Sequence, residues 1–266
     1  KNMDAIIAKP YGIENKKKDS DFREIKYLEN RLFPEICNLL NNNHKTNHSE
    51  RFWWIVIGHW FEIFVRLIFR NVNTIKNSLK LFEISGTTIC VNEDYKLYTT
   101  NYAAFNQAIY DVRWTNFLFT RIFNIQNFKN LNLEIIKEKK TLIKNEYFIT
   151  KKQKNFSSLR DKFFQLSHKC YSYFSNKFVR ENDAFIINPY LPFKEETKLE
   201  LSLGQFPQLW KKVRPEIQVK FDNLLRTKLT KEFIQETDNY VENVLRSLLF
   251  EILPIFYLEG FLELKK

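Results

Sequence analysis

Glycine and proline are scarce in this chain, and it has no glycine-rich phosphate-binding loop. The 266 residues contain only 5 Gly and 7 Pro, whereas 44% are hydrophobic and 16% are aromatic. A chain that is poor in turn-forming residues and rich in aromatic ones is not disordered. We therefore expect an ordered, largely helical body, long enough to bury a sizeable core.

Paired cysteines and a leader segment are lacking as well. Cys37, Cys90 and Cys170 stand singly without a CxxC spacing, which argues against a disulfide framework and a zinc site, so we expect no metal. The first residues, KNMDAIIAKPYGIENKKKDSDF, are charged and contain no apolar stretch before a cleavage site. A reducing cytoplasm is the simplest location. Because the chain does not begin with Met, we expect a fragment of a longer protein.

Acidic residues are too few to balance the basic ones, and the formal net charge is +11. This surplus favours an anionic partner such as a nucleotide, a phosphorylated sugar or a lipid headgroup. The lysines are spread along the whole chain, so coding preference is the simpler explanation of the charge. The basic residues are not interleaved with a recognisable stacking motif, which disfavours nucleic acid as a partner.

Helical periodicity dominates the rest of the sequence. The pattern predicts a polar arm for residues 1–20 and a single helix-rich domain for residues 21–266. Short strands are expected within 81–100 and at 184–188, with a less regular one at 147–150. The predicted fold class is α/β and helix-dominated, with a small, mostly parallel sheet and surrounding helices. The predicted helices cover residues 22–40, 52–69, 102–124, 156–178, 195–203, 216–229 and 231–253.

The most apolar stretch is HKTNHSERFWWIVIGHWFEIFVRLIF, residues 44–69, which is long enough to raise the question of a membrane span. His59, Glu62 and Arg66 fall on one narrow stripe of such a helix. A charged residue near a bilayer centre costs at least about 2.5 kcal/mol, so the stripe favours a core helix. We predict Asn47 as its N-cap, because Glu50 then occupies the third helical position, as in a capping box.

Two interpretations of this stripe remain open. In one, Glu62 and Arg66 form an ordinary surface ion pair. In the other, the stripe lines a polar cleft where His59 acts as an acid or base, and Gly58 lets another backbone come close. His44 and His48 lie before the cap and lack the glutamate of an HExxH motif, so they are not expected to hold a metal.

Further candidate residues follow from their positions in predicted elements. Arg113 lies on a mostly apolar helix, where it either contacts a phosphate or pairs with an acidic residue. Asn188, Tyr190 and Lys194 follow a predicted strand, and ligands tend to bind at that edge of open α/β sheets. An ordinary turn is the alternative interpretation of that loop.

Four stretches of the sequence, taken in order, resemble a known family. They are similar to the N-terminal half of the members of a bacterial family of surface-carbohydrate transferases. The similarity lies in the order of the stretches and in their Gly-His-Trp and Leu-Gly-Gln-x-Pro sequences. That family was first described in spirochaetes and is associated with O-antigen-type polysaccharide loci. The stretches, within residues 20–262, are LNNNHKTNHSERFWWIVIGHWFEIFVRLIFR, YDVRWTNFLFTRI, NPYLPFKEETKLELSLGQFPQLW and ILPIFYLEGFLEL. The matching positions are Asn47, His48, Ser49, Arg51, Trp53, Gly58, His59, Trp60, Trp114, Gln205 and Trp210.

The resemblance implies a longer protein with two facing α/β lobes, similar to two-lobed (GT-B-like) glycosyltransferases or to glycerophosphate polymer transferases. This chain would be the N-terminal lobe, which holds the acceptor. A missing C-terminal half would bind the nucleotide-activated donor, so no cofactor is expected in this chain. His59 stands where relatives commonly have proline, which weakens its case as an essential base. A proline there would interrupt the helix in those relatives.

The leading expectation is the acceptor-side lobe of a cytoplasmic transferase, with or without peripheral contact with the inner membrane. It would extend a bacterial surface glycan by glycosyl or glycerophosphate transfer, with the donor and a glycan or lipid-linked acceptor as partners. His48 or His59 is the expected base, and the expected anion contacts are Arg51, Arg66 and Arg113. The alternative is a non-catalytic, basic helical scaffold that binds a membrane surface.

Overall fold

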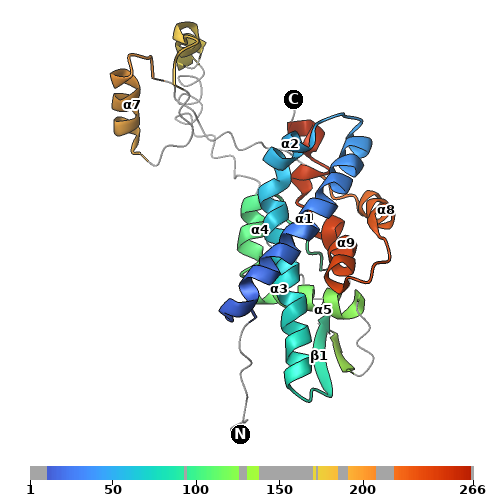
Figure 1. The fold of residues 1–266 in the computed structure, drawn as a ribbon. Helices are drawn as coiled ribbons and strands as arrows, with labels where there is room; N and C mark the ends of the chain where they lie inside the picture. The colour runs from blue at the N-terminus through green and yellow to red at the C-terminus, as the bar shows by residue number, and fades with distance from the viewer. Residues whose placement is uncertain are drawn as a thin grey trace. The chain divides into compact units, whose positions relative to one another are not determined.

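The computed structural model describes residues 11–92, 95–125, 131–137, 170–171, 173–184, 191–207 and 219–264. The chain divides into two compact units, which are shown in Figure 1. Unit 1 consists of residues 1–150 and 217–266, and unit 2 of residues 151–216. The division falls inside the single domain predicted for residues 21–266. Its first boundary lies in the basic, Asn-rich stretch 124–155, which the sequence marked as a connection.

Unit 1 is built mainly of helices that run next to one another. The long helices α1 and α3 contact each other, and α3 also contacts α9 (Figure 1). The shorter helices α5 and α8 contact α9 in turn. The elements are α1 (Asn15–His44), α2 (Glu50–Trp53), the π-helix η1 (Trp54–Gly58), α3 (His59–Leu81), α4 (Tyr102–Ala108), α5 (Val112–Ile125), α8 (Asn223–Phe233), α9 (Tyr240–Ile252), the 3₁₀ turn η4 (Ile255–Tyr257) and α10 (Phe261–Leu264).

Helix α1 confirms the first predicted helix and extends it at both ends. It begins at Asn15 rather than at Phe22, so the last residues of the predicted polar arm are helical. Leu28, Leu32 and Ile36 repeat every four residues, and all three are fully buried. The spacing therefore located the buried face correctly, although it could not mark the polar first turn, where residues 16–19 are exposed.

The continuous helical stretch Glu50–Leu81 is long and apolar enough to cross a membrane, judged by length and composition. A core helix meets the same criterion, and Phe61, Phe64 and Ile68 are fully buried inside unit 1. Their burial between helices of the same unit supports the predicted core helix.

A parallel pair of strands completes unit 1. Strand β1 (Gly86–Val91) pairs in parallel with β2 (Asn132–Lys137), with Gly86 opposite Asn132. A Cβ atom on Gly86 would lie 2.8 Å from the carbonyl oxygen of Asn132, so this close pairing needs glycine. Helices α4 and α5 lie between the strands in sequence, as a parallel connection requires. The helix-rich fold with a small parallel sheet is therefore confirmed, although β2 lies where no strand was predicted.

The breaks between helices also differ from the prediction at two places. The expected helix 102–124 is two helices, because the Asp111 carboxylate accepts hydrogen bonds from the backbone N–H groups of Arg113 (2.7 Å) and Trp114 (3.1 Å) and starts a new helix. Thr230 was expected to cap the last long helix, but it lies inside α8. Asn239 caps α9 instead, since its side chain accepts from the N–H groups of Val241 and Glu242.

Unit 2 contains α7 (Phe193–Ser202) and the 3₁₀ turn η3 (Asn176–Phe178). Helix α7 confirms the helix predicted at 195–203. It is followed by Gly204 at φ 72°, the left-handed conformation that favours glycine after a helix. The predicted strand at 147–150 lies outside the described residues, as do residues 185–188 of the other strand and most of the helix predicted at 156–178.

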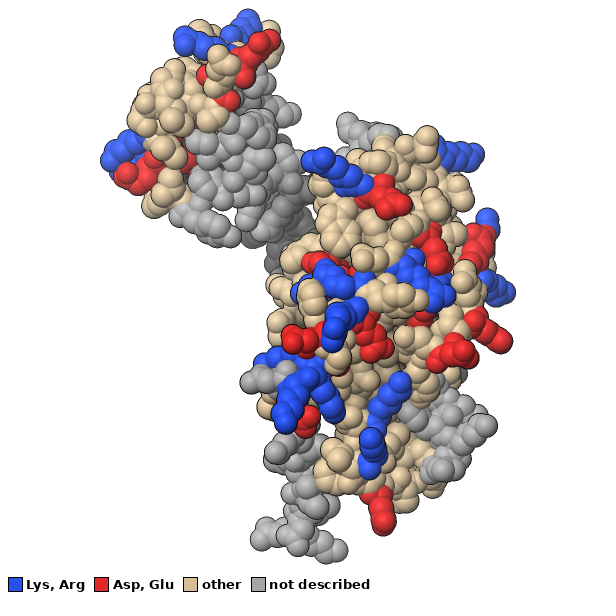
Figure 2. All heavy atoms as spheres, in the orientation of Figure 1, with Lys and Arg blue, Asp and Glu red and all other residues tan. Residues whose placement is uncertain are grey.

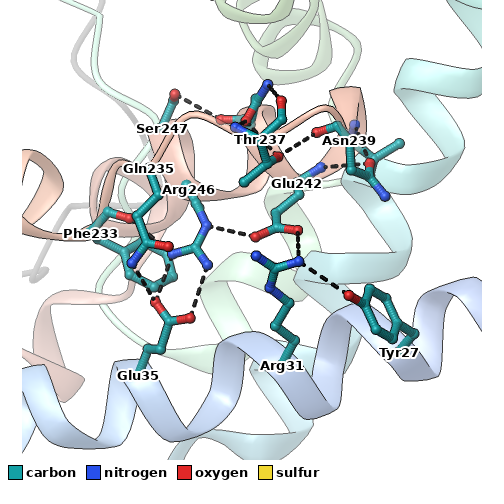
Figure 3. A network of polar contacts seen from close by, with 12 residues as sticks. Tyr27, Arg31, Glu35, Phe233, Gln235, Thr237, Asn239, Glu242, Arg246 and Ser247 are labelled. Atoms are coloured by element: carbon teal, nitrogen blue, oxygen red, sulfur yellow. Dashed lines mark hydrogen bonds and ion pairs between the residues drawn. The ribbon is translucent and has the colours of Figure 1, made fainter.

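A buried arginine joins three helices of unit 1, as Figure 3 shows. Arg246 on α9 has a side chain only 1% exposed. Its guanidinium donates to both carboxylate oxygens of Glu35 on α1, at 2.7 and 2.9 Å. It also donates to Glu242 at 2.8 Å and to the carbonyl oxygen of Phe233, the last residue of α8, at 3.0 Å. Arg31 lies 3.3 Å from the other oxygen of Glu242, so the fully buried Glu242 carboxylate faces two cations.

We predict that Arg246→Ala lowers the free energy of unfolding by about 3 to 5 kcal/mol, because it leaves a buried carboxylate without its main partner. Arg66→Ala is the control, since Arg66 pairs with Glu62 at 3.5 Å with half its side chain exposed. That change should cost no more than about 0.5 kcal/mol. Urea denaturation measures both, and equal losses would contradict a dominant role for the buried ion pair.

The same contact predicts a dependence of stability on pH. The hydrogen bond from Arg246 holds the pKa of Glu35 below its ordinary value of 4.5. The folded protein thus binds this proton less tightly than the unfolded chain, so the stabilisation is present above that value and is lost as the pH falls towards the lowered pKa. We predict that Glu35→Gln destabilises the protein by roughly 1 to 3 kcal/mol near neutral pH. The difference in the free energy of unfolding between wild type and variant should become smaller at acidic pH. A difference that stays the same at every pH would contradict the prediction.

Candidate functional site

Three of the chain's four histidines flank α2 and η1. His44 is the last residue of α1, His48 lies in the loop before α2, and His59 is the first residue of α3. The fourth, His168, lies outside the described residues. The predicted bases therefore lie on a short stretch whose local structure can be followed residue by residue.

The loop before α2 is organised by the side chain of Asn41. Its Oδ1 accepts hydrogen bonds from the Thr46 hydroxyl, the His48 backbone N–H and the Trp53 indole, each at 3.0 Å. Its Nδ2 donates to the carbonyl oxygen of His48 at 2.8 Å. The N-cap is Ser49, whose hydroxyl accepts from the N–H of Phe52, and the predicted cap at Asn47 is therefore wrong. Asn47 fitted the spacing of a capping box, but the contacts of Asn41 determine where the loop turns.

The imidazole of His44 is buried among aromatic rings. It is 6% exposed and lies 4.6 Å from the ring of Phe261 and 6.0 Å from that of Trp53, measured between centroids. Burial lowers the pKa of His44 to about 4, although the backbone of Tyr257 and the charge of Glu259 oppose the shift. With so low a pKa, the His44 imidazole is only weakly basic and is a poor general base near pH 7.

His48 lies at the edge of the same aromatic cluster. Its ring stacks on Phe52 with centroids 3.9 Å apart. The Nε2 atoms of His44 and His48 are both buried and make no hydrogen bond within the described part of the chain. Buried polar atoms normally have a partner, so these two nitrogens are exceptions within the described part of the chain.

His59 is exposed and follows the π-helix η1. Its Nε2 lies 2.8 Å from the hydroxyl oxygen of Tyr102, the first residue of α4. A Cβ atom on Gly58 would lie 2.8 Å from the Trp54 ring, so a side chain occupies the space that was predicted for a second backbone. Single π-turns of this kind are frequent at functional sites.

The polar stripe on α3 forms surface ion pairs. Glu62 lies 3.0 Å from the ammonium of Lys26 on α1 and 3.5 Å from the guanidinium of Arg66. Lys26 also bonds Glu29 at 2.6 Å. The structure therefore shows the Glu62–Arg66 pair that one of the two interpretations predicted, extended by a lysine from the neighbouring helix.

The remaining predicted residues lie in separate surroundings. Arg51 is exposed on α2, and the guanidinium of Arg113 lies 5.6 Å from the ring centroid of Tyr95. Lys194 is exposed on α7 in unit 2. Asn188 and Tyr190 lie outside the described residues, so the loop that was predicted to bind a ligand stays a prediction.

Figure 2 shows how charge is distributed over one face of the molecule. Lys and Arg side chains lie among Asp and Glu side chains there rather than in one basic patch. No group of three or more His, Cys, Asp or Glu side chains suited to a metal ion occurs among the described residues. A small anionic ligand would therefore meet local arrangements of donors on this face rather than an extended basic surface.

Unit 2 has an open cavity of its own, with a volume of about 530 Å³, lined in part by Lys177, Arg180 and Gln205. Gln205, one of the positions that match the family motif, accepts from the N–H of Ala184 at 2.8 Å and donates to its carbonyl oxygen at 2.9 Å. These contacts give Gln205 a structural role, because they tie together two segments of unit 2.

Sequence reasoning missed several residues of the site around α2. Tyr102 carries no motif, and its contact with His59 joins residues 43 positions apart. Asn41 lies in the run NNN after a predicted helix, where it looked like an ordinary helix break. Tyr257, whose burial raises its pKa to about 12, lies near both His44 and Tyr102 because the chain folds back through η4.

Comparison with known families places the chain among transferases. The family model that matches spans residues 2–266 and describes the LIC12162 family transferase. Because the match covers almost the whole chain, the chain belongs to this family. No match was found among curated proteins or among solved structures.

We predict that Asn41→Ala lowers the free energy of unfolding by about 2 to 3 kcal/mol, because it leaves the buried indole N–H of Trp53 and the loop before α2 without partners. Asn42→Ala is the matched control, since Asn42 is adjacent and exposed; it should change stability by no more than about 0.5 kcal/mol. Denaturation followed by tryptophan fluorescence measures both. Equal effects of the two variants would contradict the role of Asn41.

Proposed function

We propose that this chain is the acceptor-side part of a transferase that acts in the biosynthesis of a bacterial surface polysaccharide. The observation that carries the proposal is membership of a transferase family over residues 2–266. The four ordered stretches that resemble surface-carbohydrate transferases support the choice of pathway. On this proposal the enzyme moves a glycosyl or glycerophosphate group onto a glycan or lipid-linked acceptor.

The proposed chemistry needs a base that removes the proton of the acceptor hydroxyl, and imidazole can do this near neutral pH. His59 is the first candidate because it is exposed and Tyr102 holds its Nε2 at 2.8 Å. In the tautomer whose Nε2–H donates to the phenol oxygen, Nδ1 keeps its lone pair and is the basic nitrogen. His48 is the second candidate, and its buried Nε2 has no hydrogen-bond partner in the described residues.

The proposed substrates are anionic. The nucleotide-activated donor binds outside residues 1–266, in a two-lobed arrangement of the GT-B-like kind. The cation and polar contacts that we propose for the substrates are Arg51, Arg66, Arg113, Asn188, Tyr190 and Lys194. Such groups stabilise phosphate charge as the transferred group leaves. The enzyme acts in the cytoplasm, where peripheral contact with the inner membrane would bring it to a lipid-linked acceptor.

Substitutions in the full-length protein test the base. We predict that His59→Gln lowers kcat for polymer formation by about 100-fold or more, as loss of a general base does. Tyr102→Phe should lower kcat less and shift its pH profile, because the phenol only orients the imidazole. Arg70→Gln, an exposed change on the same helix, is the control and should leave kcat unchanged.

Two results would count against this proposal. Full polymer formation in His48→Ala, Arg51→Ala, His59→Ala, Arg66→Ala and Arg113→Ala would remove the site assignment. Salt-sensitive pelleting of this chain with anionic vesicles, combined with normal transfer in all five variants, would favour the alternative of a scaffold that binds a membrane surface.

A further inference from the structure

A second cavity lies in unit 1, and none of its lining residues was among those predicted to act. Its volume is about 300 Å³, within the usual range for small-ligand sites. We call it the basic cavity, because four cationic side chains line it and, among the residues that the structure describes, Glu251 is its one acidic lining residue. The cations come from different parts of the fold: Lys96 follows β1, Arg121 lies on α5, and Arg226 and Lys231 lie on α8.

Two of these cations already pair with a carboxylate of the fold, and Arg226 is the more fully engaged of the two. Arg226 donates from Nε and Nη2 to the two oxygens of Glu259, each at 2.7 Å, and from Nη1 to two backbone carbonyl oxygens. Its charge and four of its five N–H donors are therefore committed to holding α8 against α9 and the segment that follows it. Arg226 thus forms a fixed wall of the cavity.

Arg121 and Lys231 keep donors that a ligand can use. Arg121 donates from Nε to Glu251 at 3.0 Å and from Nη2 to the carbonyl oxygen of Tyr95 at 3.2 Å. Its Nη1 makes no hydrogen bond within the described residues, and neither does the ammonium of Lys231. Because Glu251 orients the guanidinium, Nη1 is held in place for an anion. Lys96 adds a further positive charge to the lining.

Hydroxyl groups supply the complementary kind of contact. Thr227, Thr230 and Ser247 each donate their hydroxyl hydrogen to a carbonyl oxygen one helical turn earlier, at 2.8 Å. Their oxygens can therefore only accept further hydrogen bonds. The cavity thus offers cationic donors together with neutral acceptors, which suits a ligand that carries an anionic group and hydroxyl groups on one small body.

We propose that the basic cavity binds a phosphate ester of a small polyol or sugar. The phosphate contacts Arg121 and Lys231, with Lys96 nearby, and the ligand hydroxyls donate to the threonine and serine oxygens. The proposal goes beyond the proposed function, because it uses neither His48 nor His59 and holds whether or not those residues act as bases.

Calorimetric titration of the full chain with glycerol 3-phosphate and with glucose 1-phosphate tests the proposal. Glycerol and inorganic phosphate serve as the partial ligands. At least one ester should bind saturably and more weakly as salt is added. Glycerol should not bind measurably, and inorganic phosphate should bind at least roughly fivefold more weakly than that ester.

Two variants that change charge in opposite directions sharpen the test. Lys231→Gln should weaken binding of the ester by roughly fivefold or more. Glu251→Gln should strengthen it, because the negative charge is removed while the amide oxygen can still accept from Arg121 and keep it oriented. Lys228→Gln is the matched control. It removes one positive charge from the same helix, but Lys228 is exposed, pairs with Glu232 at 3.8 Å and does not line the cavity. It should leave the affinity unchanged.

Three results would overturn the proposal. Absence of saturable binding by either ester is one, and equal weakening by Lys231→Gln and Lys228→Gln, which would reflect net charge alone, is another. Inorganic phosphate that binds as tightly as the esters would remove the polyol or sugar from the proposal. None of these results bears on transfer activity in the His59 variants, so the failure of one proposal is distinguishable from the failure of the other.

Discussion

Unit 1 depends on the burial of a charged guanidinium that the fold must satisfy from three helices at once. Arg246 reaches Glu35 on α1, Glu242 on its own helix and the last carbonyl of α8. A charge excluded from water is tolerated only with such partners. The three helices must therefore pack so that all of these partners reach the guanidinium. Arg226 repeats the device by joining α8 to Glu259. Arg226 thereby holds the segment after α9 in place, and that segment contributes Tyr257 and Phe261 to the surroundings of His44.

Much of this fold follows from local sequence signals. Apolar spacing identified α1, α3 and α7 because each buries one face or is closed by a clear stop. The strand β2 has a sequence, NLEIIK, that resembles its basic and Asn-rich neighbours, and its pairing joins residues 46 positions apart. The break between α4 and α5 depends on the carboxylate of Asp111, which a purely apolar pattern does not register. Local propensity thus predicted the long helices, while contacts between distant segments decided the turns and the sheet.

The candidate sites show the same division. Histidines near α2 stood out in the sequence, but only the fold distinguishes a neutral, buried His44 from a stacked His48 and an exposed His59 with a tyrosine partner. The residues of the basic cavity carried no motif, because Lys96, Arg121 and Lys231 come from segments that lie up to 135 positions apart (231 − 96) in the sequence. Sequence reasoning found single residues with suitable chemistry. It could not find clusters of residues that come together only when the chain folds.

Unit 2 is inserted into unit 1, since residues 151–216 separate the two parts of its chain. During synthesis, α1 therefore leaves the ribosome long before the helix that completes its core. Glu35 and Arg246 are 211 positions apart, which corresponds to about 10 to 40 s of translation at typical rates. For that interval the nascent N-terminal helices expose the apolar faces that α9 will cover. The hydrophobic core is thus incomplete while the chain is being synthesised. Exposed apolar surface of this kind is what molecular chaperones bind.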